Sequence, residues 1–131
     1  MPTATAFDAL GDERFVSLTT FRRSGEPVST PVWVARDGDA LVVTTPTESG
    51  KVKRLRHTAR VELRPCDRRG RVKAGTDPVA GTAAILTDEG SRDRLTDVIR
   101  LKYGLEYRVV MAIERLSRSG RRPRTILRIT R

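Results

Sequence analysis

"VSTPVWVARDGDALVVTT", residues 28–45, decides the fold because it contains two extended segments and the turn between them. β-Branched and aromatic side chains dominate residues 28–36 and 40–45, which favours strands over helices in both places. The Asp-Gly-Asp sequence at residues 37–39 is typical of a tight hairpin turn. We therefore predict an antiparallel hairpin, with one strand over residues 28–36 and the next over residues 40–45.

The flanking segments add strands to this hairpin. Residues 14–22 read as a strand and residues 23–27 as a turn, so three consecutive strands are expected to form a meander. Further strands are predicted over residues 60–66, 79–87 and 125–130. Sequential hairpins and a proline, Pro31, within a strand favour a small antiparallel barrel over a doubly wound sheet. The expected class is mainly β (α+β), with about six strands and peripheral helices.

Four helices are predicted, one before the first strand and three between later strands. A short one ends at Gly11, a basic one begins at Ser49, and a third runs from Asp88 to a stop at Gly104. The fourth covers residues 105–116 because apolar residues recur there at helical spacing, although residues 107–113 alone also fit a strand. Those apolar residues are Leu105, Val109, Ala112, Ile113 and Leu116. Residues 117–124, SRSGRRPR, read as a basic loop.

Length and composition predict one globular domain over residues 1–131, since 37% of the residues are hydrophobic and 32% are charged. No apolar run approaches the roughly 20 residues needed to span a bilayer. The N-terminal residues lack the plan of a signal peptide, so we expect a cytoplasmic protein. Cys66 and His57 are each the only residue of their type. Metal clusters and most hydrolytic mechanisms are therefore disfavoured, and no metal site is expected.

The formal net charge of +10 is concentrated in two stretches. Residues 49–73 contain ten Lys or Arg against two acidic residues, giving +8, and residues 118–131 contain six Arg and no acid, giving +6. The remainder carries ten basic and fourteen acidic side chains, or −4. Such local basicity indicates an anion-binding surface, whose partner is nucleic acid, a membrane surface or a phosphorylated small molecule.

The basic helix in SGKVKRLRHTAR, residues 49–60, concentrates this charge at a helix start. Unpaired N–H groups already make a helix N-terminus positive, so Lys51 and Lys53 add repulsion unless an anion binds there. A solvated basic face is the alternative.

Pro31 and Trp33 mark a second candidate feature, a strand irregularity beside a large aromatic ring. Thr44 and Thr45 end the next strand just before the basic helix.

The order of these features resembles a known family. Residues 24–63, SGEPVSTPVWVARDGDALVVTTPTESGKVKRLRHTARVEL, resemble the flavin and deazaflavin oxidoreductases of the pyridoxamine 5′-phosphate oxidase-like superfamily, whose fold is a split β-barrel. Within it, the sequence is similar to a small actinobacterial branch that uses coenzyme F420. AGTAAILTDE, residues 80–89, resembles a later barrel strand of the same family.

The resemblance implies a homodimer with the cofactor in a groove at the subunit interface. It places Thr30, Pro31, Val32 and Trp33 against the ring system, and Thr44 and Thr45 along it. It places the phosphate at the start of the basic helix, held by Ser49, Gly50, Lys51 and Lys53. Val52 and Arg54 complete the cofactor-binding residues that the resemblance implies.

Gly50 departs from the family pattern, because flavin mononucleotide (FMN) oxidases typically have an arginine there. This favours F420, whose anionic tail of phosphate and glutamates would be matched by Arg54, Arg56, Arg60 and Arg64, with FMN as the alternative cofactor. The protein is thus expected to transfer a hydride between F420 and a small organic substrate. The cofactor supplies that chemistry, so no catalytic side chain is named; Glu48, Glu62, Tyr103 and Tyr107 are the conceivable proton donors.

Other readings remain open. One is a split-barrel protein that binds FMN or haem. Another, of a different class, is a basic nucleic-acid-binding module, which the sequence pI near 11.1 would fit. Aromatic residues make up only 5% of the chain and no paired aromatic platform stands on a strand, which disfavours nucleic acid. The basic C-terminal loop is either solvated or lies over the partner's cofactor groove.

Overall fold

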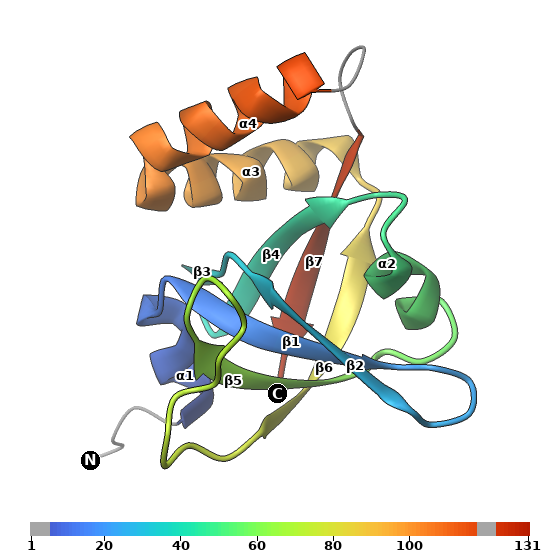
Figure 1. Cartoon of the computed structure of the whole chain (residues 1–131). Helices are drawn as coiled ribbons and strands as arrows, with labels where there is room; N and C mark the ends of the chain where they lie inside the picture. The colour runs from blue at the N-terminus through green and yellow to red at the C-terminus, as the bar shows by residue number, and fades with distance from the viewer. Residues whose placement is uncertain (1–5, 118–122) are drawn as a thin grey trace.

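The computed structural model describes residues 6–117 and 123–131, which form an antiparallel sheet with peripheral helices (Figure 1). The sheet has seven strands in the order β2-β1-β5-β6-β7-β4-β3. The strands are β1 (Phe15–Phe21), β2 (Pro27–Val32), β3 (Ala35–Asp37), β4 (Ala40–Pro46), β5 (Arg60–Cys66), β6 (Val79–Leu86) and β7 (Arg124–Thr130). The helices are α1 (Ala6–Ala9), which continues into the 3-10 turn η1 (Leu10–Asp12), then α2 (Gly50–Leu55), α3 (Glu89–Tyr103) and α4 (Leu105–Ser117).

The strand predicted over residues 28–36 is wrong as a single strand. Its first part, β2, pairs with β1, whereas its last part, β3, pairs with β4 at the other edge of the sheet. The predicted meander is therefore also wrong, and the strand count rises from about six to seven. The hairpin turn at residues 37–39 is confirmed, because Asp37 pairs with Ala40 and Gly38 has a φ of 59°.

This split strand curls the sheet into an open barrel. Only Trp33 and Val34 separate β2 from β3, so the two sheet edges lie no further apart than a three-residue step, roughly 10 Å. No ladder is recorded between β2 and β3 within residues 6–117 and 123–131. The backbone passes directly from β2 to β3, but no backbone hydrogen bonds join these two edge strands. A barrel left open between two edge strands is the predicted split barrel.

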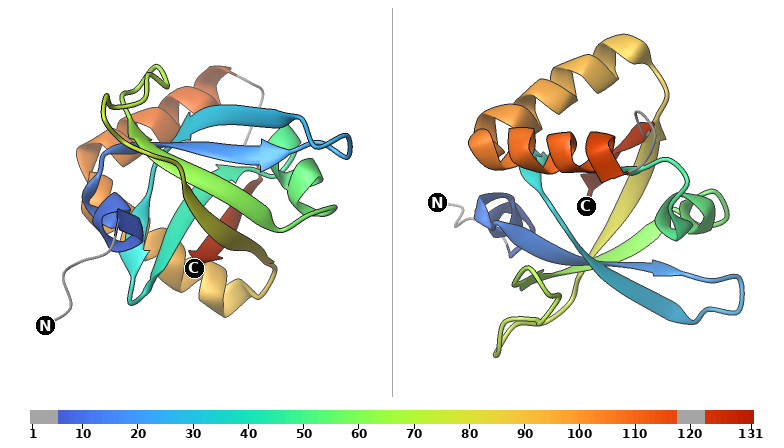
Figure 2. Two further views of the ribbon diagram at one scale, coloured as in Figure 1. Left: turned by 90° about the horizontal axis from the view of Figure 1, so that it is seen from below. Right: turned by 45° about the horizontal axis from the view of Figure 1, so that its top comes forward.

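Two apolar clusters hold this architecture together. The first fills the barrel and includes Phe7 of α1, Leu18, Leu63 and Leu127. The second lies outside the barrel, under α3, and includes Trp33 and Ile99. Figure 2 shows α3 and α4 side by side over one part of the sheet, while α1 and α2 lie at opposite ends of the barrel.

The predicted helix limits are largely confirmed. The Asp88 carboxylate accepts the N–H of Ser91 at 2.8 Å and caps α3, and Gly104 ends it with a φ of 53°. Residues 105–116 are helical, so the strand alternative for 107–113 is wrong. Residues 118–122, most of the predicted basic loop, lie outside the described part of the chain. None of the helices described is both long enough and apolar enough to cross a membrane.

Candidate functional site

The gap between β2 and β3 leaves backbone groups that need partners away from the sheet. Tyr103, at the end of α3, supplies them: its hydroxyl oxygen accepts the N–H of Val34 at 2.9 Å and lies 2.8 Å from the Val34 carbonyl oxygen. The same hydroxyl is 2.9 Å from the carbonyl oxygen of Arg14. Burial raises the pKa of Tyr103 to about 12, so the hydroxyl stays protonated at neutral pH.

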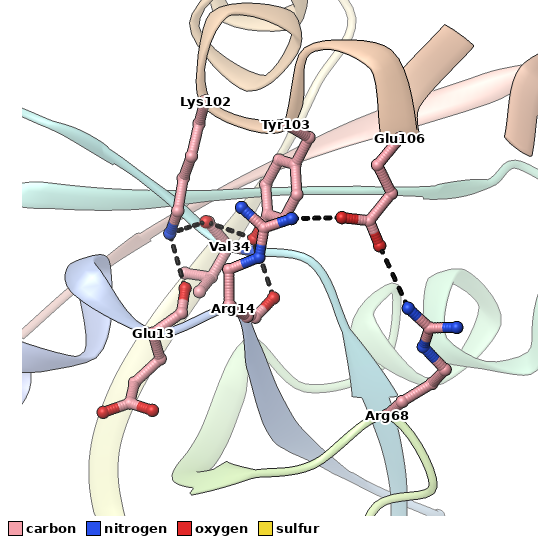
Figure 3. Close-up of polar contacts among 7 residues, drawn as sticks. All are labelled: Glu13, Arg14, Val34, Arg68, Lys102, Tyr103 and Glu106. Carbon is pink, nitrogen blue, oxygen red and sulfur yellow. Dashed lines mark hydrogen bonds and ion pairs between the residues drawn. The ribbon is translucent and has the colours of Figure 1, made fainter. Parts of the chain in front are cut away.

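Lys102 reinforces this junction (Figure 3). Its ammonium group donates to the carbonyl oxygens of Gly11, Glu13 and Val34 at 2.9, 2.5 and 2.6 Å. Burial lowers the pKa of Lys102, although three carbonyl acceptors satisfy its three donors. Beside it, Glu106 binds both Arg14 and Arg68, which ties the start of α4 to the start of β1 and to the loop after β5.

Trp33 is fixed in place by this junction. Its indole stacks on the Tyr103 ring with centroids 4.7 Å apart and an interplanar angle of 18°, and the Tyr107 ring is 6.1 Å away. The indole is 9% exposed. A stacked ring on a pinned backbone has little freedom, so Trp33 presents a rigid apolar wall to whatever lies beside it.

A small groove lies beside this wall. Its volume is about 190 Å³. Its lining comes from β1, β2, β4, α2, α4, β7 and the link after β2, and includes Pro31, Val32, Trp33, Thr44, Thr45 and Lys51. Half of the twelve predicted cofactor-binding residues therefore meet in one cavity. Four further lining residues, Phe15, Pro46, Val110 and Arg124, are absent from the sequence prediction.

Arg124 is the main addition. β7 pairs antiparallel with β4 and sets Arg124 opposite Pro46, so its side chain reaches Thr44 through its Oγ1 at 3.1 Å and its carbonyl oxygen at 3.3 Å. Nη1 of its guanidinium also donates to both carboxylate oxygens of Glu114 of α4, at 3.0 and 2.9 Å. Sequence analysis predicts only a basic segment here, because the β4–β7 register that directs Arg124 toward Thr44 is a long-range pairing.

The basic helix α2 forms where predicted because Val52 and Leu55 are buried on one side of it. Ser49 stands at its N-cap with extended backbone, but its side chain makes no capping bond and instead accepts from the Thr45 hydroxyl at 3.3 Å. The cap leaves the early N–H groups of α2 without a side-chain acceptor.

Lys51 is the cation that α2 directs into the groove. It is half-buried, and no carboxylate of the described residues forms an ion pair with it. Burial lowers its pKa below the ordinary value of 10.5, and the positive charges of Arg54 and Arg124 lower it further. An ammonium group held among like charges and away from water is stabilised by a bound anion.

Arg54 occupies the space above Gly50. A Cβ on Gly50 would lie only 2.6 Å from Nη1 of Arg54, so the absence of a side chain at residue 50 makes room for this guanidinium. Its Nε donates to the Thr20 hydroxyl at 2.6 Å. Burial lowers the pKa of Arg54, and the charge of Arg22 adds to this.

The other predicted site residues lie away from the groove lining. Val52 is fully buried in the core and Lys53 is exposed. The Thr30 hydroxyl is buried and makes no hydrogen bond in the described part of the chain. Ser49 lies in an adjoining cleft with Glu48.

The side chains considered for the anionic tail or for proton transfer have varied surroundings. Arg60 pairs with Glu62 at 3.5 Å and covers the Phe21 ring, and Arg64 donates to the Thr76 carbonyl oxygen at 2.5 Å. Arg56 is exposed.

Burial raises the pKa of Cys66 to about 11, which makes its thiol a poor nucleophile. Nowhere in residues 6–117 and 123–131 do three His, Cys, Asp or Glu side chains gather to hold a metal ion.

Comparisons with known proteins agree with this geometry. The family model for pyridoxamine 5′-phosphate oxidase matches residues 3–130. Solved structures with the same fold include an F420 reductase, with 19% identity, a TM-score of 0.59, and 99% of this chain and 94% of that one covered. A FAD-binding protein from Mesorhizobium loti has 17% identity and a TM-score of 0.63, with 92% and 81% covered.

A haem storage protein from Vibrio cholerae has 12% identity and a TM-score of 0.61, with 91% and 82% of the two chains covered. At these identities the structures show a shared fold alone. No curated protein has a matching sequence.

Proposed function

We propose, from the premise that this chain belongs to the pyridoxamine 5′-phosphate oxidase family, that it binds a phosphate-bearing flavin-type cofactor in the groove beside Trp33. The preferred cofactor is the deazaflavin F420, and the activity is hydride transfer between it and a small organic substrate. The observation that carries the proposal is Lys51, a half-buried cation without a carboxylate partner in the described residues, at the rim of a groove with an aromatic wall.

The chain's own groups divide the work of binding. Pro31, Val32 and Trp33 offer an apolar surface to a ring system, and Thr44 and Thr45 line the groove beside it. The Thr44 hydroxyl accepts from Arg124 and keeps its own proton to donate. Lys51 and the early N–H groups of α2 would hold a phosphate. The cofactor, when bound, supplies the hydride chemistry, while the protein orients it and excludes water.

F420 is preferred to FMN because of residues 50 and 54. Gly50 lacks the arginine typical of the FMN oxidases, and the Arg54 guanidinium fills the space above it. Arg54 and the exposed Arg56 leave positive charge on the α2 side of the groove for a longer anionic tail. Arg60 and Arg64 already have partners and contribute less than the sequence suggested.

A second copy of the chain is part of the proposal. The groove of about 190 Å³ is smaller than the 300–1,000 Å³ typical of ligand pockets, so a further surface is needed to enclose a tricyclic ring. Helix α4 also exposes an apolar stripe, in which Leu105 is 74%, Val109 48%, Ile113 58% and Leu116 86% exposed. A homodimer would cover such a surface.

The direct test is a pair of fluorescence titrations of the purified protein, one with F420 and one with FMN. Saturable binding of F420, tighter than that of FMN, supports the proposal. Tighter FMN binding would instead favour the flavin alternative. A protein that binds neither cofactor, and that purifies with nucleic acid visible in its ultraviolet absorbance, would refute the proposal.

A further inference from the structure

A second groove lies between α3, α4 and the adjoining ends of β4 and β7. Its volume is about 830 Å³. Five arginines line it, against two acidic residues, Asp93 and Glu114. We call it the arginine groove; its arginines are Arg92, Arg100, Arg108, Arg115 and Arg124. Figures 1 and 2 show the two helices that form its long walls.

Three of these arginines have no ion pair within the described residues, and two of the three belong to α4. Arg124 is bound by Glu114, and Arg100 pairs with Asp97 at 3.2 Å. Arg92 donates to the carbonyl oxygen of Arg124 at 3.1 Å, which satisfies a donor but adds no negative charge. Arg108 and Arg115 have no ion pair within the described residues, and both belong to α4.

The spacing of Arg108 and Arg115 determines how far apart the acidic groups of a ligand must be to bind both. They are seven residues apart on one helix, so they lie on the same face about 10 Å apart along its axis. Two anionic groups on one small molecule can meet both. The groove also has an apolar part, contributed by Tyr107, Met111 and Ile126, which would contact a carbon skeleton between the acidic groups.

The arginine groove adjoins the proposed cofactor groove. Thr44 and Arg124 line both cavities. Tyr107, in the arginine groove, is the same ring that lies 6.1 Å from Trp33. A ligand bound along α4 therefore ends beside the position proposed for the reacting ring.

We propose that the arginine groove binds the acidic part of a small molecule that carries at least two carboxylate or phosphate groups. This inference rests on the proposed function only for its second half, the access of that molecule to the cofactor. We assign the acidic groups to an anionic substrate, because the tail of F420 is assigned above to Arg54 and Arg56 on the α2 side. The tail offers the same recognition chemistry, so it is the alternative that the experiment below has to distinguish.

The test is calorimetric titration with citrate and with pyrophosphate at about 0.15 M salt, where non-specific attraction is screened. The variant Arg108→Ala/Arg115→Ala removes the two cations of α4 that have no ion pair within the described residues. The variant Arg69→Ala/Arg131→Ala removes the same charge from exposed sites outside the groove. We expect the first variant to weaken binding about tenfold or more, since each contact is charge-assisted, and the second to change it less than about twofold. Equal loss in both variants, no loss in either, or no binding by the unmodified protein would overturn the proposal.

Two further titrations identify the source of the acidic groups. If the tail of F420 occupies the groove, the Arg108→Ala/Arg115→Ala variant binds F420 more weakly but binds a deazaflavin phosphate without glutamates as before. If a substrate occupies it, both deazaflavins bind this variant normally and citrate binds the F420-loaded protein. Failure of F420 to bind the unmodified protein would refute the proposed function while leaving the citrate and pyrophosphate results to decide this inference.

Discussion

Lys51 is the residue on which the proposed phosphate site depends most. It lines the groove, is half-buried and lacks a carboxylate partner among the described residues. Lys53, two positions along the same helix, is exposed. A ligand in the groove would therefore contact Lys51, whereas Lys53 would contribute only long-range positive charge.

We expect Lys51→Ala to weaken F420 binding by about 1.5–3 kcal/mol, the range for a hydrogen bond to a charged group. Lys53→Ala removes the same charge from the same helix and should cost less than about 1 kcal/mol. Fluorescence titration measures both. Equal losses in the two variants would indicate a diffuse electrostatic effect and contradict a phosphate contact at Lys51.

The pH dependence gives a second check on Lys51. Its pKa lies below 10.5 because of burial and the neighbouring charges of Arg54 and Arg124, so it loses its proton earlier than an exposed lysine. Cofactor affinity should therefore fall as pH rises through that lowered pKa. Lys51→Arg stays charged and should keep its affinity at higher pH. Identical pH profiles for Lys51→Ala and the unmodified protein would exclude this titration.

Tyr103 is the residue that fixes the position of Trp33. We expect Tyr103→Phe to destabilise the fold by about 1–3 kcal/mol, because it leaves the buried N–H of Val34 without an acceptor. Tyr107→Phe is the matched control, since no hydrogen bond of its hydroxyl is recorded among the described residues, and it should change stability by less than about 0.5 kcal/mol. Urea unfolding monitored by Trp33 fluorescence compares the two. An unchanged midpoint for Tyr103→Phe would contradict its role as the acceptor.

Among the elements, α3 and α4 are connected by a single glycine, Gly104. Gly104 adopts φ 53° and ψ −122°, a conformation that residues with a Cβ avoid. Gly90, within the first turn of α3, has ordinary helical backbone, and a Cβ there would approach nothing closer than Asp88 Oδ2 at 3.7 Å. Gly104 is therefore required by its backbone conformation, whereas at Gly90 the backbone and the surrounding space also accept alanine.

We expect Gly104→Ala to destabilise the protein by more than about 1 kcal/mol, because alanine is strained at this backbone conformation. Gly90→Ala should stabilise it by up to about 1 kcal/mol, because alanine has the higher helix propensity. Thermal unfolding of both variants measures the difference. A stabilising Gly104→Ala would show that the junction between α3 and α4 adapts without strain.

The elements also show what the sequence predicts and what it does not. Helix ends at Asp88 and Gly104 follow local rules of capping and positive φ, so they were predictable. The break at residues 33–34 was not, because the pattern from Val28 to Arg36 is continuous. The groups that satisfy it, Tyr103 and Lys102, lie about 70 residues further along the chain.

The residues of the candidate site likewise fall into those predicted from local sequence and those placed by long-range contacts. Pro31, Trp33 and Lys51 were predicted from local signals and from the family resemblance, and they meet in one groove. Val52 was also predicted to bind the cofactor. Its side chain is fully buried, because a helix of six residues has one buried side and residue 52 lies on it. Arg124 was missed because strand pairing between β4 and β7, not local sequence, brings it to Thr44.

At the scale of the whole molecule, the exposed stripe on α4 is the feature that the single chain leaves unexplained. The apolar residues whose spacing predicts this helix are mostly on its exposed side, whereas Tyr107, Val110 and Met111 pack toward α3 and the sheet. An exposed row of this kind is costly in water and typical of an interface.

We expect the protein to sediment as a dimer and Ile113→Asp to shift it toward the monomer, because a buried unpaired carboxylate opposes association. Ala80→Asp, a charge added at an exposed strand position away from α4, is the control and should leave the dimer intact. Analytical ultracentrifugation distinguishes the species. A monomeric unmodified protein at micromolar concentration would contradict the proposed homodimer.

The most direct measurement for the whole molecule is a crystal structure with F420 bound. The expected result is the deazaflavin ring against Pro31, Val32 and Trp33, with its phosphate at Lys51 and the first N–H groups of α2. A ring bound elsewhere on the protein, with only solvent at Lys51, would contradict the assignment of this groove to the cofactor.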